Sequence, residues 1–250
     1  MARVSIGAAW TETSAFVKRE GALLLPVALL FVAIPFALML QLIPDDFRAE
    51  MAKPRDARAM PELPVGVLLG LMLGFAITMI GTLSLYALAL RPGISVAEAL
   101  QRGLRRVPVS IGASLMVGFL LSVPMLMISV ASPSMGTSFL LVSAAVVSIR
   151  LLPLNAIIVA QDRRIADSLK AGWAMTRGQF WKLAGFALLL MALTVFAEVV
   201  AQMMLGLVGY VIAGAEGGAA GANLGTALAM GVAQIYSSVM ISRLYLQFTR

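Results

Sequence analysis

Four polar side chains interrupt the long apolar runs of this sequence, and these are the residues best placed to do chemistry inside a membrane. Arg150 lies near the middle of one apolar run, with Asn155 five residues further on. Glu198 and Gln202 are four residues apart in another run, so a helix would place them on one face. A charge at that depth costs at least ~2.5 kcal/mol on insertion scales, so each charged residue is a functional candidate.

Three interpretations of these four residues are open. Arg150 and Glu198 can form a structural ion pair, which is the interpretation we favour, although their expected depths differ by roughly 8 Å at about 1.5 Å per residue. Alternatively, the four residues line a polar transport path. In the third interpretation they pack separately, with each long side chain reaching toward the interface.

A second candidate site is a group of basic residues in the stretches that connect the apolar runs. Positive-inside orientation can account for this group without any binding function. Their amphipathic setting, with Trp173, Phe180 and Trp181 nearby, also predicts contact with anionic phospholipid headgroups. The candidate headgroup-binding residues are Arg102, Arg105, Arg106, Arg163, Arg164, Lys170, Arg177 and Lys182.

The sequence contains few of the residue types that usually carry out catalysis. The chain has no cysteine and no histidine, which removes the commonest metal ligands and the commonest general base. No P-loop lysine, nucleophile elbow or carboxylate pair at metal-ligand spacing is present. We therefore expect no enzyme, no metal site and no cofactor. The net charge of +7 lies in short connectors, so we expect no nucleic-acid partner either.

The elements that must position these residues are membrane-spanning helices. Hydrophobic residues make up 60% of the 250 residues, charged residues only 12%, and the mean hydropathy is +0.95. Such a composition cannot cover a soluble surface. The sequence predicts an all-α polytopic membrane protein, a single membrane domain over 1–250 with six transmembrane helices. The expected spans are 21–43, 64–90, 109–131, 139–160, 183–205 and 222–246.

The distribution of basic residues predicts the orientation of these spans. With Arg150 inside a span, the remaining Lys and Arg divide into 14 on one side and 4 on the other. The smaller group is Arg48, Lys53, Arg55 and Arg58. The side richer in Lys and Arg is retained in the cytoplasm, so we expect a multi-pass protein of the bacterial cytoplasmic (inner) membrane with both termini cytoplasmic.

An amphipathic segment precedes each odd-numbered span. These segments, 5–19, 95–107 and 164–181, are expected to be interfacial helices in the headgroup plane. The second begins with Ser95 and Glu98 at capping-box spacing. The similarity of Ser5–Trp10 to Ser168–Trp173 suggests three repeats of interfacial helix plus transmembrane hairpin, although basic connectors can produce such a pattern by chance.

The stretch Arg150-Leu151-Leu152-Pro153-Leu154, followed by Met175-Thr176-Arg177-Gly178-Gln179-Phe180-Trp181, carries a family resemblance. It resembles the membrane domain of glycerophosphodiester phosphodiesterases and related uncharacterised bacterial integral membrane families. The resemblance is best over 150–190 and implies a multi-helix membrane module with a connection to lipids. In those enzymes the reaction belongs to a separate soluble domain, which this chain lacks, so diesterase activity is not implied here.

The sequence thus favours a non-enzymatic inner-membrane protein that binds, organises or distributes envelope lipid, with anionic phospholipid as its partner. One alternative is a small transporter or lipid flippase with a polar path at mid-membrane depth. Another is an accessory subunit of a larger membrane complex. Besides anionic phospholipid, the partners to expect are further copies of this chain, in a homo-oligomer, or a larger membrane complex.

Overall fold

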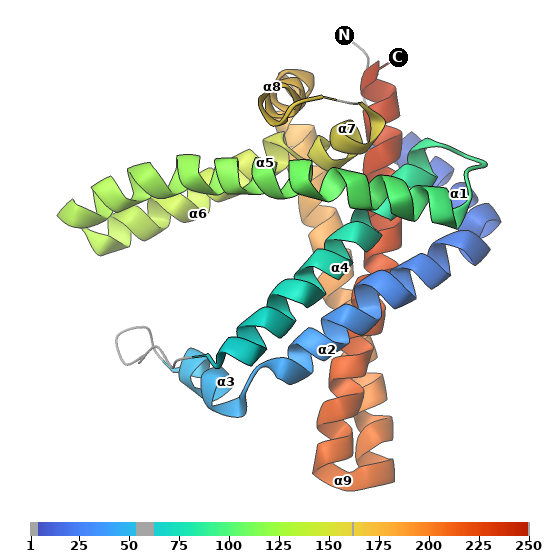
Figure 1. The fold of residues 1–250 in the computed structure, drawn as a ribbon, viewed down its shortest axis with the longest axis vertical. Coiled ribbons are helices and arrows are strands. Elements are labelled where there is room, and N and C mark those ends of the chain that lie inside the picture. Colours follow the sequence, from blue (N-terminus) through green and yellow to red (C-terminus); the bar gives the residue numbers. More distant parts are fainter. Residues whose placement is uncertain (1–4, 54–62, 162, 250) are drawn as a thin grey trace. The chain divides into compact units, whose positions relative to one another are not determined.

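The computed structural model describes residues 5–53, 63–161 and 163–249, and within these ranges the chain is helical without strands. The helices are α1 (Ile6–Ala28), the π-helical turn η1 (Leu29–Ala33), α2 (Ile34–Leu42), α3 (Asp45–Ala52), α4 (Val65–Leu90), α5 (Val96–Ala131), α6 (Pro133–Arg150), α7 (Leu154–Ala160), α8 (Ile165–Met175) and α9 (Phe180–Thr249) (Figure 1). They form two compact units. Unit 1 comprises 1–21, 83–192 and 236–250, and unit 2 comprises 22–82 and 193–235.

Five of the described helical stretches are long and apolar enough to cross a membrane: Ile6–Leu42, Val65–Leu90, Val96–Ala131, Pro133–Arg150 and Phe180–Thr249. Many of their large apolar side chains are exposed, including Val130 at 91%. Hydrocarbon contact removes the cost of such exposure, which water would impose. The all-helical fold and this apolar surface are those of a multi-pass membrane protein.

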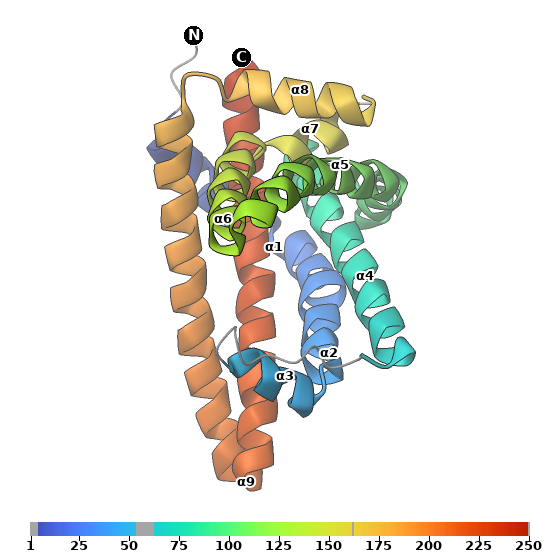
Figure 2. The same cartoon turned by 90° about the vertical axis from the view of Figure 1, so that its left-hand side faces the viewer.

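Unit 1 is built around the hairpin of α5 and α6, which lie side by side in Figures 1 and 2. Ser132 joins them in an extended conformation, and Pro133 follows at the first position of α6, where the missing N–H costs nothing. The short helices α7 and α8 pack on each other and on α5. Figure 2 shows α8 lying crosswise to the two ends of α9 that belong to this unit.

The start of α1 and the end of α9 also meet within unit 1. The backbone N–H of Ser5 donates to Oε1 of Gln247 at 3.0 Å. Further along the same two helices, the rings of Trp10 and Tyr236 stack with centroids 6.0 Å apart. The guanidinium of Arg243 lies 4.6 Å from the ring centroid of Phe16. One hydrogen bond and two aromatic contacts thus join the start of α1 to the end of α9.

Unit 2 contains the turn of α9. Its backbone leaves the helical region at Ala213 and Gly214, and Gly214 has φ of 66°, a left-handed conformation that favours glycine. A Cβ on Gly217, Gly221 or Gly225 would overlap backbone of the facing arm. The two arms, 193–212 and 215–235 in this unit, therefore pack backbone to backbone through small residues.

A second glycine face in unit 2 lies on α4. A Cβ built on Gly70, Gly74 or Gly81 would lie within 3 Å of Leu42, Met39 or Phe31 respectively. The helical spacing of Gly66, Gly70, Gly74 and Gly81 predicts close helix packing, and the structure confirms that prediction at the last three positions. At Gly66 the prediction is wrong, because nothing lies within 4 Å of a Cβ built there.

The helix boundaries differ from the expected ones in three places. The expected span 139–160 is interrupted, because α6 ends at Arg150 and a turn through Pro153 precedes α7. The expected interfacial helices 5–19 and 95–107 continue into the following spans as parts of α1 and α5, and only 164–181 is separated, by Gly178 with φ of 82°. The arms of α9 also extend beyond 183–205 and 222–246 to meet at the turn.

Between α2 and α4 the sequence predicts one connector, 44–63, with a short helix around Arg48 to Met60. Helix α3 (Asp45–Ala52) lies in it, and residues 54–62, including Arg55 and Arg58, lie outside the described residues. The described part of this connector belongs to unit 2 and contains Arg48 and Lys53.

Candidate functional site

A pocket rich in arginine lies at the start of α5 in unit 1 and is here called the arginine pocket. It has a volume of about 510 Å³. Its lining residues are Arg91, Ile94, Glu98, Gln101, Arg102, Arg105 and Arg106. Three of the predicted headgroup-binding arginines are thus brought together around one space, and Arg91, which the sequence suggested only as an orientation signal, joins them.

The local sequence explains why Arg91 faces the other arginines. Helix α4 ends at Leu90, and Pro92-Gly93 reverses the chain, with Gly93 at φ of 92°. Ser95 and Glu98 then form the predicted capping box at the start of α5. The backbone N–H of Ser95 donates to Oε2 of Glu98 at 2.8 Å, and the N–H of Glu98 donates to Oγ of Ser95 at 3.2 Å.

The charge of the arginine pocket is poorly balanced. Its four arginines face one carboxylate, that of Glu98, whose Oε2 is engaged by the capping box. Among the described residues, the buried Nη1 of Arg102 has no hydrogen-bond partner. A buried donor without an acceptor costs about 1–3 kcal/mol, and like charges at this spacing repel, so an anion would relieve both costs.

A second pocket, here called the amphipathic groove, lies between α5 and the start of α8. It has a volume of about 640 Å³. Val109, Gly112 and Met116 provide an apolar wall on α5, while Arg163 and Arg164 stand exposed at the other side. A Cβ on Gly112 would lie 2.5 Å from Cδ1 of Ile165, so this glycine lets α8 approach α5 closely. The positive charge of Arg163 and Arg164 beside the apolar wall of the amphipathic groove matches the charged headgroup and apolar chains of an anionic phospholipid.

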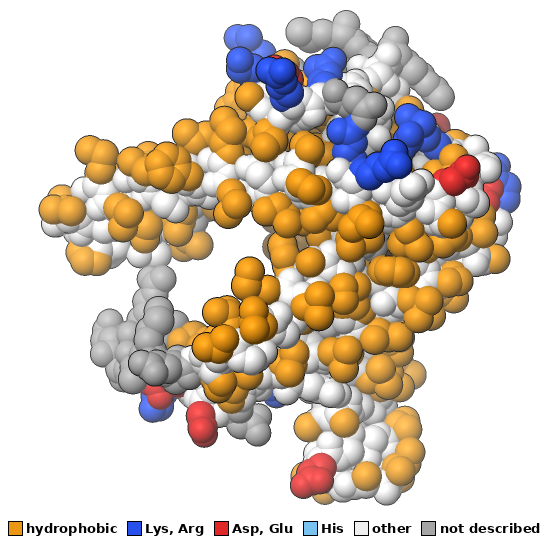
Figure 3. All heavy atoms as spheres, in the orientation of Figure 1, with side chains coloured by type: hydrophobic (Ala, Val, Ile, Leu, Met, Phe, Trp, Pro, Cys, Tyr) orange, Lys and Arg blue, Asp and Glu red, His pale blue; other side chains and the backbone are white. Residues whose placement is uncertain are grey.

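The remaining predicted headgroup-binding residues are on or just after α8. Lys170, Arg177 and Lys182 are exposed, as is the indole of Trp173 at 46%. Figure 3 shows blue side chains gathered over α8 and over the start of α5, with orange side chains along the α5–α6 hairpin. An exposed basic and aromatic helix lying across neighbouring helices is suited to the headgroup layer.

Arg150 is held by the junction between α8 and α9. Its Nη1 donates to the carbonyl oxygen of Thr176 at 3.1 Å, and the buried Oγ1 of Thr176 lies 3.0 Å from the carbonyl oxygen of Arg150. The guanidinium lies 5.3 Å from the ring centroid of Trp173 and 5.5 Å from that of Phe180. We call these reciprocal contacts the Arg150–Thr176 clasp. They satisfy backbone groups at the end of α6.

The four polar residues that the sequence predicts within the membrane are distributed over both units. Asn155 accepts a hydrogen bond from Oγ of Ser110 at 3.3 Å, which ties α7 to α5 in unit 1. Glu198 and Gln202 follow each other on one turn of α9 in unit 2. The described partners of Arg150 are all in unit 1, so its pairing with Glu198 stays a prediction, as does a polar path through all four residues.

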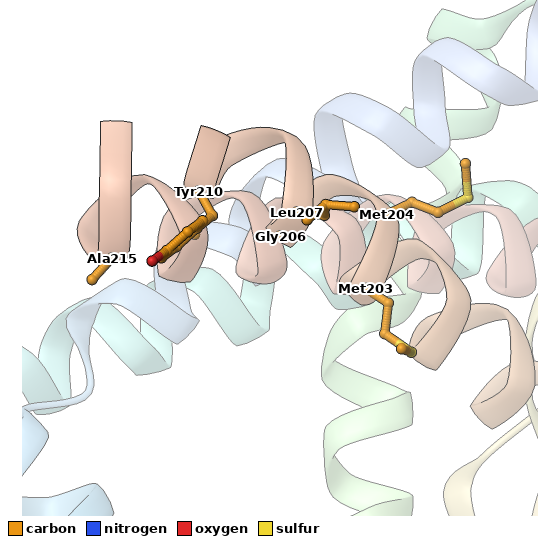
Figure 4. A pocket seen from close by; sticks show the side chains of 7 residues that line it. Met203, Met204, Gly206, Leu207, Tyr210 and Ala215 are labelled. Carbon is orange, nitrogen blue, oxygen red and sulfur yellow. The ribbon is translucent and has the colours of Figure 1, made fainter. Parts of the chain in front are cut away.

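Unit 2 has a pocket of different character beside the turn of α9. Its volume is about 720 Å³. Figure 4 shows Met203, Met204, Leu207 and Tyr210 on one arm and Ala215 beyond the turn. The lining is almost entirely apolar, so this pocket suits an acyl chain or a neighbouring apolar helix but offers no charge to a headgroup.

Two contributors to these sites were not predicted from the sequence. Arg91 precedes a Pro-Gly turn, and that turn is the signal that could have placed it beside Arg102. Thr176 falls within the stretch that resembles a known membrane domain, but no local pattern shows that its hydroxyl faces Arg150. Within the described ranges, no group of His, Cys, Asp and Glu could hold a metal ion.

Comparison of the chain with protein-family models, with curated proteins and with solved structures finds no match.

Proposed function

We propose that this chain is a non-enzymatic protein of the bacterial inner membrane that binds anionic phospholipid and thereby organises or distributes envelope lipid. The amphipathic groove is the observation that carries the proposal, because Arg163 and Arg164 flank an apolar wall of suitable size for part of a lipid. The basic exposed face of α8 adds attraction worth about 1 kcal/mol per residue near an anionic surface.

We also propose six membrane crossings with both ends in the cytoplasm. The turn at Ala213–Gly214 divides α9 into two arms, and each arm is long enough to cross a membrane. Because α9 counts as one of the five apolar stretches, its two arms bring the number of crossings to six. The contact between Ser5 and Gln247 agrees with an even number. Among the described basic residues, only Arg48 and Lys53 belong to unit 2, the same partition that the charge bias predicts.

Cysteine labelling tests this topology cleanly, since the chain has no cysteine of its own. Single cysteines at the exposed positions Lys53, Met135 and Ala219 should react with an impermeant thiol reagent added to intact spheroplasts. Cysteines at the equally exposed Ala97 and Ala174 should react only after the membrane is opened. Reaction of Ala97→Cys in intact spheroplasts would overturn the orientation.

The lipid-binding proposal is tested by native mass spectrometry of protein released from nanodiscs with its lipids retained. Replacing Arg163 and Arg164 together with glutamine should reduce retained phosphatidylglycerol by about tenfold or more, since each charge contributes about 1 kcal/mol. The matched control is Arg48→Gln with Lys53→Gln, which changes the net charge equally in unit 2. Equal retention by both double variants would contradict lipid binding at the groove and leave the basic residues as orientation signals only.

A further inference from the structure

We propose that the arginine pocket is a discrete site for one phosphate group carrying two negative charges, as in a phosphate monoester. The inference rests on the proposed function only in part, because such a phosphate can belong to a lipid headgroup or to a soluble molecule. A discrete site predicts one bound ligand per chain and a preference for a doubly charged phosphate over a singly charged one. General attraction to an anionic surface predicts neither.

The charge of the pocket argues for a doubly charged ligand. Four arginines and one glutamate leave a formal net charge of +3 around about 510 Å³. A phosphate monoester carries about −1.5 to −2 at pH 7 and presents three strong acceptor oxygens, whereas a phosphodiester carries only one negative charge. The monoester therefore neutralises more of the repulsion among Arg91, Arg102 and Arg105.

The hydrogen-bonding state of the pocket argues for a ligand with acceptors. Buried Nη1 of Arg102 has no partner among the described residues, and the pocket's single carboxylate already accepts from the N–H and hydroxyl of Ser95. Guanidinium groups bind phosphate oxygens through parallel N–H donors, which gives directional as well as electrostatic recognition. A phosphate supplies an acceptor for Arg102 that the described side chains do not.

The frame of the pocket is fixed before any ligand arrives. The capping box holds the first turn of α5, and the Pro92-Gly93 turn fixes where Arg91 leaves α4. Arg102, Arg105 and Arg106 then follow at helical spacing on α5, with Gln101 beside them. Because the backbone is set by local hydrogen bonds, only the arginine side chains have to adjust on binding.

The test uses the full-length protein in phosphatidylcholine nanodiscs, with two kinds of probe. Inorganic phosphate is titrated calorimetrically, and retention of phosphatidic acid is compared with that of phosphatidylglycerol by native mass spectrometry. We expect one ligand per chain and about a tenfold preference for phosphatidic acid over phosphatidylglycerol. Binding of phosphatidic acid without inorganic phosphate would assign the site to a lipid, and the reverse would assign it to a soluble phosphate compound.

Variants separate this site from the amphipathic groove. Arg102→Gln should weaken phosphate or phosphatidic acid binding by about tenfold or more, and Arg102→Lys should also weaken it because the forked donors are lost. Arg91→Gln provides a second test at an exposed position outside any helix, where folding is not at risk. The matched control is Lys18→Gln, an exposed cation of unit 1 that lies in neither pocket, which should bind as the unaltered protein does.

Each outcome bears on one of the two proposals. Equal retention of the two lipids together with no phosphate binding, or equal effects of Arg102→Gln and Lys18→Gln, overturns the phosphate site. Loss of phosphatidylglycerol from the Arg163 and Arg164 variant is independent of that result and tests the groove. Binding of inorganic phosphate by a protein that retains no anionic lipid would support the phosphate site while refuting the proposed lipid function.

Discussion

Replacing Arg150 with leucine is expected to destabilise the protein by about 2–4 kcal/mol. The change removes a charged hydrogen bond to the carbonyl oxygen of Thr176, worth about 1.5–3 kcal/mol. It also removes the approach of the guanidinium to the rings of Trp173 and Phe180, worth about 0.5–2 kcal/mol. Thermal unfolding in detergent, followed by far-ultraviolet circular dichroism, measures the loss. Arg177→Leu, at an exposed neighbouring position, should change stability by no more than about 0.5 kcal/mol.

A double-mutant cycle identifies the partner of Arg150. Thr176→Val removes the hydroxyl that lies near the carbonyl oxygen of Arg150 but keeps the Thr176 carbonyl to which Arg150 donates, so its effect should be roughly additive with that of Arg150→Leu. Glu198→Leu gives the competing cycle. Strong coupling between Arg150 and Glu198, with recovery of stability in their double variant, would show that Arg150 is held by an ion pair with Glu198 and not by the Arg150–Thr176 clasp. Unchanged stability with loss of solute or lipid flux in liposomes would favour a transport path.

The second large effect is expected at Gly225, where alanine should destabilise the hairpin of α9 by about 1–3 kcal/mol or more. A Cβ at this position overlaps the backbone carbonyl of Ala201 on the facing arm. Backbone cannot rotate away as a side chain can, so the two arms have to separate over several turns. The loss is measured as a lower midpoint for unfolding in sodium dodecyl sulfate.

The matched control is Gly185→Ala on the same helix. Nothing lies within 4 Å of a Cβ built there, so alanine adds helix propensity without a clash and should be neutral or stabilising by up to about 1 kcal/mol. If Gly225→Ala unfolds at the same detergent concentration as Gly185→Ala, the conclusion that the two arms pack backbone to backbone at Gly225 would be wrong.

The predictions made from sequence succeed where the signal is local or repeats along a helix. All-helical structure follows from long apolar runs, the capping box of α5 follows from Ser95 and Glu98, and close packing at Gly70, Gly74 and Gly81 follows from their spacing. Each depends on residues within a few turns of each other. None requires knowledge of which distant segments meet.

The features that escaped prediction depend on distant partners or on turns that hydropathy does not show. Pro153 predicts a kink within the expected span 139–160, but apolar residues on both sides of Arg150 hide that α6 ends at Arg150, where this residue contacts Thr176. In α5, by contrast, Pro108 does not break the helix, so a segment expected to lie separately in the interface joins a 36-residue helix. Hydropathy reports how much apolar length is present, but tertiary contacts decide where it divides.

The joining of α1 to the end of α9 has a consequence for biosynthesis. Ser5 and its partner Gln247 are 242 positions apart, and Trp10 and Phe16 likewise depend on Tyr236 and Arg243. During translation, the first helix must therefore enter the membrane long before these partners leave the ribosome. Until then the aromatic side chains of α1 have no native neighbours from α9, so this part of unit 1 can assume its final packing only late in synthesis.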